Sequence, residues 1–129
     1  MWCNISMTDE KSMPKNRRKY RRYPIFATAL IKIKNKKDAV PFESMAANIS
    51  QSGLGIYSYV PVDKGTPVSI EIKFIAIKGF EQKDAIEGKI VHLSKLGKLY
   101  YMGIAFDEEL NPVTQPFLYN HFWKIASWD

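Results

Sequence analysis

The sequence predicts an all-β fold, a small antiparallel β-barrel of six strands followed by one C-terminal helix. Three observations predict it: short apolar runs that alternate with polar residues, Gly or Pro chemistry between the runs, and helical spacing near the C-terminus. The 129 residues, 46% of them hydrophobic, suffice for one domain with a buried core. We expect a flexible leader at residues 1–16 and one domain at 17–129, with the barrel at about 24–107.

The first three strands are predicted in the N-terminal half of the chain. Residues 25–34 end in strict alternation, which is typical of a half-buried strand, and a second strand is predicted at about 40–49. Residues 50–53 form a tight turn in which Gly53 is free to adopt a positive φ. A third strand is predicted at 54–60, so that the chain doubles back twice before its midpoint.

The second half of the chain supplies three more strands and the helix. Residues 68–74 show the cleanest alternation, with four apolar side chains facing a core. A polar loop is expected around 79–84, and strands at 85–93 and 99–106 form a hairpin. Six strands in this order favour a meander, and the spacing of apolar residues over 113–126 predicts a helix that packs on or beside the barrel.

The composition excludes several classes of protein. Cys3 is the only cysteine, and His92 and His121 lack the spacing of a second ligand, so we expect no disulfide, no metal site and no cofactor. No nucleophile and base stand in a catalytic arrangement, so the sequence does not indicate an enzyme. No apolar run approaches a membrane span and no secretory signal is present, which favours a cytoplasmic protein.

The positive charge of the chain is concentrated at one end. Residues 1–40 carry 11 basic and 3 acidic side chains, whereas residues 41–129 carry 8 basic and 10 acidic side chains. All four arginines lie in the stretch 17–22, and every other basic residue is a lysine. Because arginine offers a planar fork of donors that suits phosphates and guanine edges, this cluster favours an anion site over a solvated tail.

Two short motifs give the cluster a more specific meaning. Arg18 and Arg22 have RxxxR spacing just before the first strand, and residues 48–53, NISQSG, fit [D/N]xSxxG at the turn after the second strand. Together, at this spacing, they resemble the PilZ domain family, whose members bind the bacterial second messenger cyclic di-GMP. The resemblance covers residues 17–107 and implies a six-stranded PilZ-like barrel.

The resemblance also implies roles for the arginines. Arg18 and Arg22 match the positions that bind the phosphates and guanine edges of cyclic di-GMP. Arg17 matches a position that is often arginine in the family and contacts a second guanine of a stacked ligand pair. Arg21 lies inside the motif, where solvent exposure is the simpler interpretation.

The turn motif supplies the other side of the expected site. Asn48 and Ser50 match positions whose short polar side chains hydrogen-bond a guanine edge, and Gly53 allows close backbone approach. Asn48 is aspartate in many relatives, so this chain keeps the acceptor and loses the charge. Without the arginine cluster, the same residues would be interpreted as an ordinary Asx-type turn.

We hypothesise that the arginine-rich arm is mobile when free and becomes ordered over bound cyclic di-GMP, so that a protein partner reads the changed surface. Two alternatives stay open. A small barrel with a basic arm and exposed tyrosines is typical of proteins that bind single-stranded nucleic acid, although the slightly acidic barrel disfavours this. A PilZ-fold adaptor would act through a protein partner, for which Phe117, Phe122, Trp123 and Trp128 supply apolar surface.

Overall fold

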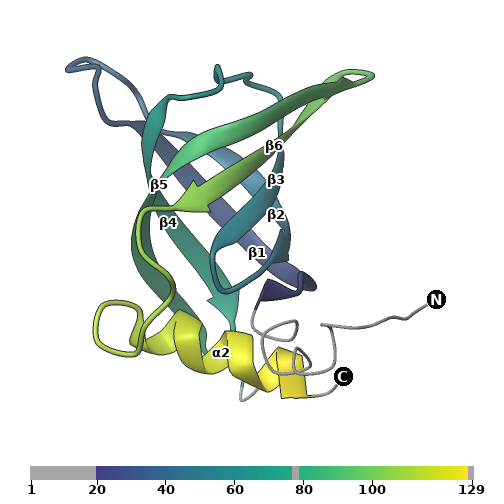
Figure 1. Ribbon diagram of the computed structural model, residues 1–129, viewed down its shortest axis with the longest axis vertical. Coiled ribbons are helices and arrows are strands. Elements are labelled where there is room, and N and C mark those ends of the chain that lie inside the picture. Colours follow the sequence, from purple (N-terminus) through teal and green to yellow (C-terminus); the bar gives the residue numbers. More distant parts are fainter. Residues whose placement is uncertain (1–19, 77–78, 128–129) are drawn as a thin grey trace, which may run out of the picture.

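A computed structural model describes residues 20–76 and 79–127 of the chain. It contains six antiparallel strands and one C-terminal helix, so the mainly β fold is confirmed (Figure 1). The elements are β1 (Tyr23–Ile33), β2 (Phe42–Ile49), β3 (Gly53–Ser58), β4 (Pro67–Ile75), β5 (Glu81–Leu96), β6 (Leu99–Phe106) and α2 (Pro116–Ser127). The leader at 1–16 and the side chains of Arg17 and Arg18 lie outside the described residues.

The strands close into a barrel, but not in the order of a meander. Their order around the barrel is β1-β2-β3-β6-β5-β4, so the expected meander is wrong. β3 pairs with β6 instead of β4, and β4 pairs with β1. Each of the six strands thereby has a neighbour on both sides, which protects the backbone groups along its two edges from pairing with another chain.

The core fills the barrel with the apolar side chains that alternate along each strand. Val68, Ile70 and Ile72 of β4 are fully buried, as the alternation predicts. The other strands contribute in the same way, and the fully buried set includes Ala29, Ile31, Ile49, Leu54, Ile56, Ile90, Met102 and Ile104. Burial of this apolar surface is the main term that holds the six strands together.

Several predicted boundaries differ from the observed strands, and three of the differences are informative. β2 begins at Phe42 instead of residue 40, because Pro41 has no N–H to donate to a ladder. β3 ends at Ser58, where the side-chain hydroxyl bonds both the N–H and the carbonyl of Val60 and so competes with the ladder. The polar loop expected around 79–84 is mostly strand, since β5 begins at Glu81.

The early start of β5 follows from its backbone pairing with β4, and charged side chains line the paired segment. Its first residues pair with β4, and the side chains of Lys73 and Glu81 lie 3.7 Å apart, those of Lys83 and Glu71 3.8 Å apart. Opposite charges on neighbouring strands are compatible with a solvent-facing ladder. A run of polar residues therefore does not by itself mark a loop.

The C-terminal helix α2 closes one end of the barrel (Figure 1). Leu118, Phe122 and Ala126 are its buried residues, and the Phe122 ring meets the Tyr23 ring edge-on at 5.8 Å. The helix begins at Pro116, later than predicted, because Asn111 Oδ1 accepts bonds from the N–H groups of the two residues before Gln115 and makes a turn there.

One of the two tryptophans near the C-terminus can be placed. Trp123 is partly buried and packs against the core, whereas Trp128 lies outside the described residues. Phe122 is fully buried, so the apolar partner surface expected from it is wrong, while Phe117 is exposed. Within residues 20–76 and 79–127, no helix has the length and apolar character needed to cross a membrane.

Candidate functional site

A β-bulge in β2 turns Asn48 to the outer surface of the barrel. Ala46 pairs with Ile56 and Asn48 pairs with Gly55, so two steps along β2 correspond to one step along β3 and Ala47 is the extra residue. In a regular strand Asn48 would share the inward direction of Ala46, which is buried. The bulge reverses this, and the amide comes to lie outside the core.

A second bulge, in β5, extends this outer row. Ile90 pairs with Ile104 and His92 pairs with Gly103, which makes Val91 the extra residue and turns His92 outward. Across four neighbouring strands the paired outward positions are therefore Asn48, Gly55, Gly103 and His92. Two glycines at the centre of this row leave a low floor between two polar side chains.

The side chains of Arg22, Asn48 and Tyr101 form one hydrogen-bonded chain over this floor. Arg22 Nη1 donates to Asn48 Oδ1 at 2.6 Å, and Asn48 Nδ2 donates to the Tyr101 hydroxyl at 3.1 Å. Arg22 directly precedes β1, Asn48 lies near the end of β2 and Tyr101 lies within β6. The fold thus joins the two sequence motifs and adds a tyrosine from a third strand.

The turn between β2 and β3 is held by its own serines. The Ser50 N–H donates to the Gly53 carbonyl at 2.9 Å, and the Ser52 N–H donates to Ser50 Oγ at 3.2 Å. Ser50 is buried, with 2% of its surface exposed, so it supports the turn. The Ser50 hydroxyl contacts Ser52 and does not contact Arg22 or Asn48 in the described structure.

Gly53 is needed for space and not for an unusual backbone angle. Among the described glycines a positive φ occurs at Gly65, Gly79 and Gly97, so Gly53 does not use the positive φ that is open to it. A Cβ atom on Gly53 would lie 2.6 Å from the Ile104 carbonyl oxygen and 3.4 Å from Arg22 Nη2. Glycine at this position therefore allows the backbones of β3 and β6 to approach closely, and it leaves room for the Arg22 guanidinium beside the turn.

The structure thus brings together Arg22, Asn48 and Gly53, with Ser50 behind them in the turn. The positions of Arg17 and Arg18 are not among the described residues. Tyr101 and Gly55 were not singled out from the sequence. Only the pairing of β3 with β6 identifies them, because it places Tyr101 opposite Tyr57, two residues along β3 from Gly55.

The same two motifs are tied to the segment between β6 and α2. The Tyr20 hydroxyl, within the arginine motif, donates to Glu109 Oε2 at 2.7 Å. Gln51, within the turn motif, is buried and donates through Nε2 to the Leu110 carbonyl at 2.6 Å, while the Leu110 N–H donates to the Gln51 carbonyl at 3.0 Å. Two consecutive residues of one connection thus contact both motifs.

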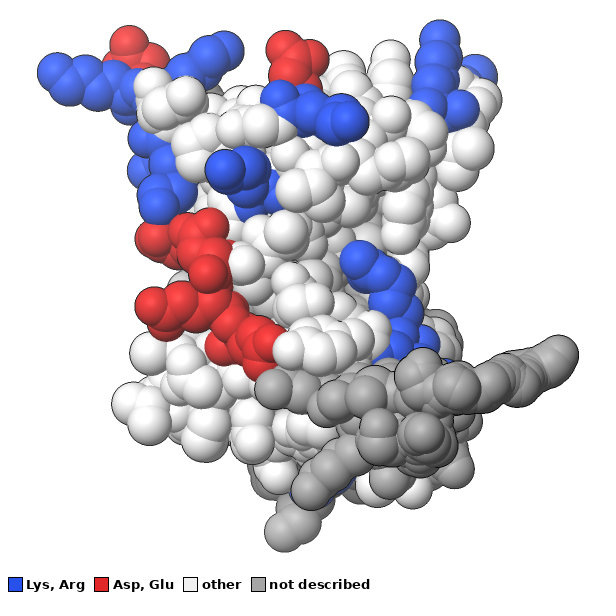
Figure 2. Space-filling model, viewed as in Figure 1, with Lys and Arg blue, Asp and Glu red and all other residues white. Residues whose placement is uncertain are grey.

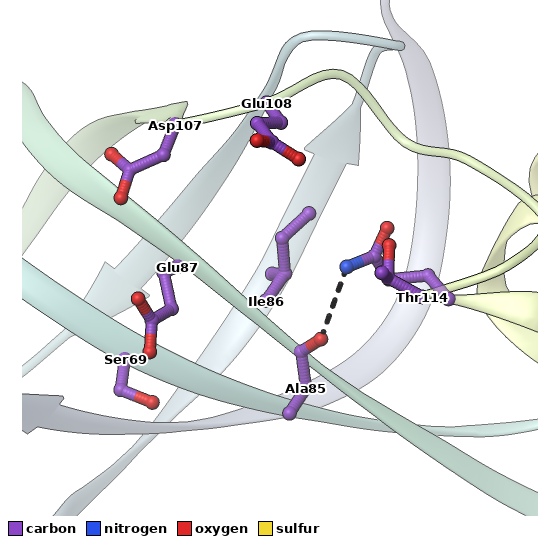
Figure 3. A pocket seen from close by; sticks show the side chains of 8 residues that line it. Ser69, Ala85, Ile86, Glu87, Asp107, Glu108 and Thr114 are labelled. Carbon is purple, nitrogen blue, oxygen red and sulfur yellow. Dashed lines mark hydrogen bonds between the residues drawn. The ribbon is translucent and has the colours of Figure 1, made fainter.

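A separate hollow of about 380 Å³ lies beside β5 and the segment after β6 (Figure 3). The carboxylates of Glu87, Asp107 and Glu108 line it, and Gln115 Nε2 donates to the Ala85 carbonyl at 3.3 Å. In Figure 2, acidic groups gather over this region, whereas most basic groups on the same face lie toward the other end. The three carboxylates make this hollow unfavourable for an anion.

Two side chains elsewhere have a shifted pKa. The hydrogen bond from Lys34 to Glu87, 2.6 Å long, raises the pKa of Lys34 above its usual value, with Asp107 adding to the effect. Burial, and then the charge of Lys124, lowers the pKa of His121 below its usual value. Neither side chain belongs to the two motifs, so neither titration bears directly on the candidate site.

Comparison with known proteins points to one family. The profile of the PilZ domain matches residues 16–117. The Bacillus subtilis inhibitor of motility, MotI/DgrA, superposes with a TM-score of 0.63 at 14% identity, over 84% of this chain and 51% of its own. The chain therefore spans about half the length of that protein.

A second solved structure agrees in fold. The PilZ domain of YcgR from Escherichia coli, solved with c-di-GMP, superposes with a TM-score of 0.58 at 15% identity, over 84% of this chain and 92% of its own. No curated protein sequence matches the chain. At these identities the two structures establish the fold, while the profile match extends through the barrel and into α2.

Proposed function

The chain belongs to the PilZ domain family, and from that premise we propose that it is a receptor for cyclic di-GMP. The observation that carries the proposal is the contact between the two motifs, in which Arg22 Nη1 donates to Asn48 Oδ1 at 2.6 Å. A single ligand seated there can meet arginine donors on one side and the turn on the other. The YcgR domain of the same fold was solved with this ligand.

The chemistry of the ligand suits the residue types at the site. Cyclic di-GMP carries two phosphates and two guanines, and the arginine fork binds both phosphate oxygens and guanine acceptors. We assign these roles to Arg18 and Arg22, with Arg17 on the second guanine of a stacked ligand pair. Asn48 supplies a short polar group for a guanine edge. Ser50 holds the turn that presents it, and Gly53 leaves the space in which the Arg22 guanidinium lies against that turn.

We propose that the ligand acts as a signal through its effect on the arginine-rich segment. Binding orders residues around 12–24 over the barrel face, and a protein partner reads the changed surface. The hydrogen bonds of Tyr20 to Glu109 and of Gln51 to Leu110 support this, because they connect both motifs to the segment that leads into α2. The protein is then a cytoplasmic effector and not an enzyme.

Calorimetric titration with cyclic di-GMP tests the proposal, with GTP as the ligand control. We expect saturable binding of cyclic di-GMP and none of GTP. Arg22→Ala removes charge-assisted hydrogen bonds, so its dissociation constant rises about tenfold to a hundredfold. Arg21→Ala is the matched control, because it removes the same charge from the neighbouring residue, whose guanidinium lies 5.6 Å from the Tyr23 ring centre.

Equal losses in the two variants would show a general charge effect and contradict a specific site. Absence of binding by the wild-type protein would overturn the proposal, and single-stranded oligonucleotides would then be tested over a range of salt concentration. The ordering of the arm is tested by limited trypsin digestion. Cleavage at Lys15 to Arg22 should slow at saturating cyclic di-GMP, and an unchanged rate would refute ligand-induced ordering.

A further inference from the structure

The hydrogen bonds around Asn48 fix the orientation of its amide. A guanidinium has only donors, so the atom that receives Arg22 Nη1 at 2.6 Å must be the amide oxygen. The amide nitrogen then faces the Tyr101 hydroxyl, 3.1 Å away, and acts as the donor in that bond. The Tyr101 oxygen is consequently an acceptor, and the hydrogen of the hydroxyl points elsewhere.

That hydrogen has no protein acceptor in the described part of the chain, where the bond from Asn48 is the hydroxyl's one hydrogen bond. Asn48 Oδ1 likewise keeps a lone pair, since a carbonyl oxygen accepts two bonds and Arg22 occupies one. The partly exposed pair therefore offers one acceptor and one donor side by side on the outer face of the barrel.

We propose that Tyr101 sets the base preference of this site, together with Asn48, by presenting a donor beside an acceptor that matches the edge of guanine. The inference rests on the proposed function. The N1–H of guanine donates to Asn48 Oδ1, and its O6 accepts from the Tyr101 hydroxyl. Adenine carries an amino donor where guanine carries O6, so it would face the hydroxyl donor with a second donor.

The ring of Tyr101 is held in place by its neighbours. It meets the Tyr57 ring at 5.3 Å and the His92 ring at 6.0 Å, both in edge-on geometry. Beneath the hydroxyl, a Cβ on Gly55 would overlap the Tyr101 oxygen and lie 2.7 Å from Asn48 Oδ1. The hydroxyl and the amide thus rest directly on the backbone of β3, and a ligand meets them without rearranging the strands.

The test compares the wild-type protein with Tyr101→Phe, which keeps the ring and removes the hydroxyl. Tyr59→Phe is the matched control, since Tyr59 is 76% exposed and undergoes the same chemical change. Dissociation constants for cyclic di-GMP and cyclic di-AMP are measured by competition with a labelled cyclic di-GMP. In Tyr101→Phe we expect affinity for cyclic di-GMP to fall about tenfold, and the preference over cyclic di-AMP to fall by a similar factor.

The outcomes separate this inference from the function on which it rests. If the wild-type protein does not bind cyclic di-GMP, both proposals are overturned. If it binds and Tyr101→Phe binds equally well, only the role of Tyr101 is overturned. An equal loss for both ligands would mean that the hydroxyl only supports the site, and the base preference would then have another source.

A second measurement tests the hydrogen bond between Asn48 and Tyr101 directly and needs no ligand. The side-chain amide signals of Asn48 in a ¹⁵N spectrum are assigned by their disappearance in Asn48→Ala. They should move in Tyr101→Phe and stay in place in Tyr59→Phe, because only the first variant removes the acceptor of the Asn48 amide. If these signals stay in place in Tyr101→Phe, the hydrogen bond between Asn48 and Tyr101 is absent in solution and the inference is overturned.

Discussion

Two glycines of β3 show how single residues shape the site. At Gly53 a side chain would press on the Ile104 carbonyl, and at Gly55 it would displace the Asn48 amide and the Tyr101 hydroxyl. Neither requirement is a matter of backbone angle, since neither glycine has a positive φ. What each supplies is the absence of a Cβ where other groups must come close.

Two glycines in the same outer row should therefore differ in the cost of replacement by alanine. In Gly55→Ala the new methyl displaces the Tyr101 hydroxyl and the Asn48 amide, so we expect weaker ligand binding together with a loss of about 1 kcal/mol of stability. Gly103→Ala is the control, because its Cβ meets the Cβ of His92 at 3.3 Å and little else. Denaturant unfolding measures both, and equal costs would contradict the steric explanation.

The sequence identifies only part of the candidate site at this scale. Asn48 and Gly53 stand in a short motif, and the structure finds both in contact with the Arg22 side chain or close to it. Tyr101 lies 53 residues from Asn48 along the chain, and the two meet because β3 stands between β2 and β6. Periodicity carries no information on which strands become neighbours, so Tyr101 cannot be predicted from it.

At the level of strands, the alternation of apolar and polar residues predicts where a strand lies better than it predicts which side chains face outward. The strand predicted at 99–106 is observed with the same bounds, and the alternating run at 68–74 lies within β4. The bulge at Ala47 is different, because one extra residue reverses the inward and outward directions of the side chains after it. The sequence shows the polar residue at 48, but only the pairing shows that it faces outward.

The packing of α2 on the barrel predicts a pH dependence of stability. The His121 ring stacks on Phe74 of β4 at 4.5 Å, and burial followed by the charge of Lys124 lowers the pKa of His121 in the folded protein. The unfolded chain, with a pKa near 6.5, therefore takes up the proton first as the pH falls. This contribution to stability is complete above about pH 6.5 and is lost as the pH falls toward the lower folded pKa.

The prediction is tested by chemical denaturation between about pH 7.5 and pH 5, the range over which a histidine titrates. His121→Phe keeps an aromatic ring against Phe74 and removes the titrating group, so its stability should decline less over this range than that of the wild type. A decline of wild-type size in His121→Phe would assign the effect to other groups.

For the molecule as a whole, the connection between β6 and α2 is the point where the site meets the rest of the fold. Glu109 accepts from Tyr20 of the arginine motif, and Leu110 exchanges bonds with Gln51 of the turn motif. Further along the same connection, Gln115 bonds the Ala85 carbonyl of β5, and its carbonyl accepts from the Tyr119 N–H in the first turns of α2. A ligand that fixes both motifs therefore also restrains the path that leads to the helix.

We accordingly expect cyclic di-GMP to slow amide hydrogen exchange in residues 107–119, none of which belongs to either motif. The reason is that opening this connection breaks the bonds to Tyr20 and Gln51, which bound ligand holds in place. The connection at 34–41, between β1 and β2 at the opposite end of the barrel, is the internal control and should exchange at the same rate with and without ligand (Figure 1). Tyr20→Phe removes the bond to Glu109 and should reduce the protection of 107–119 while leaving the fold intact. If protection is confined to the motifs, or spreads equally to 34–41, then the connection does not carry the signal, and a partner would have to read the arginine-rich segment directly.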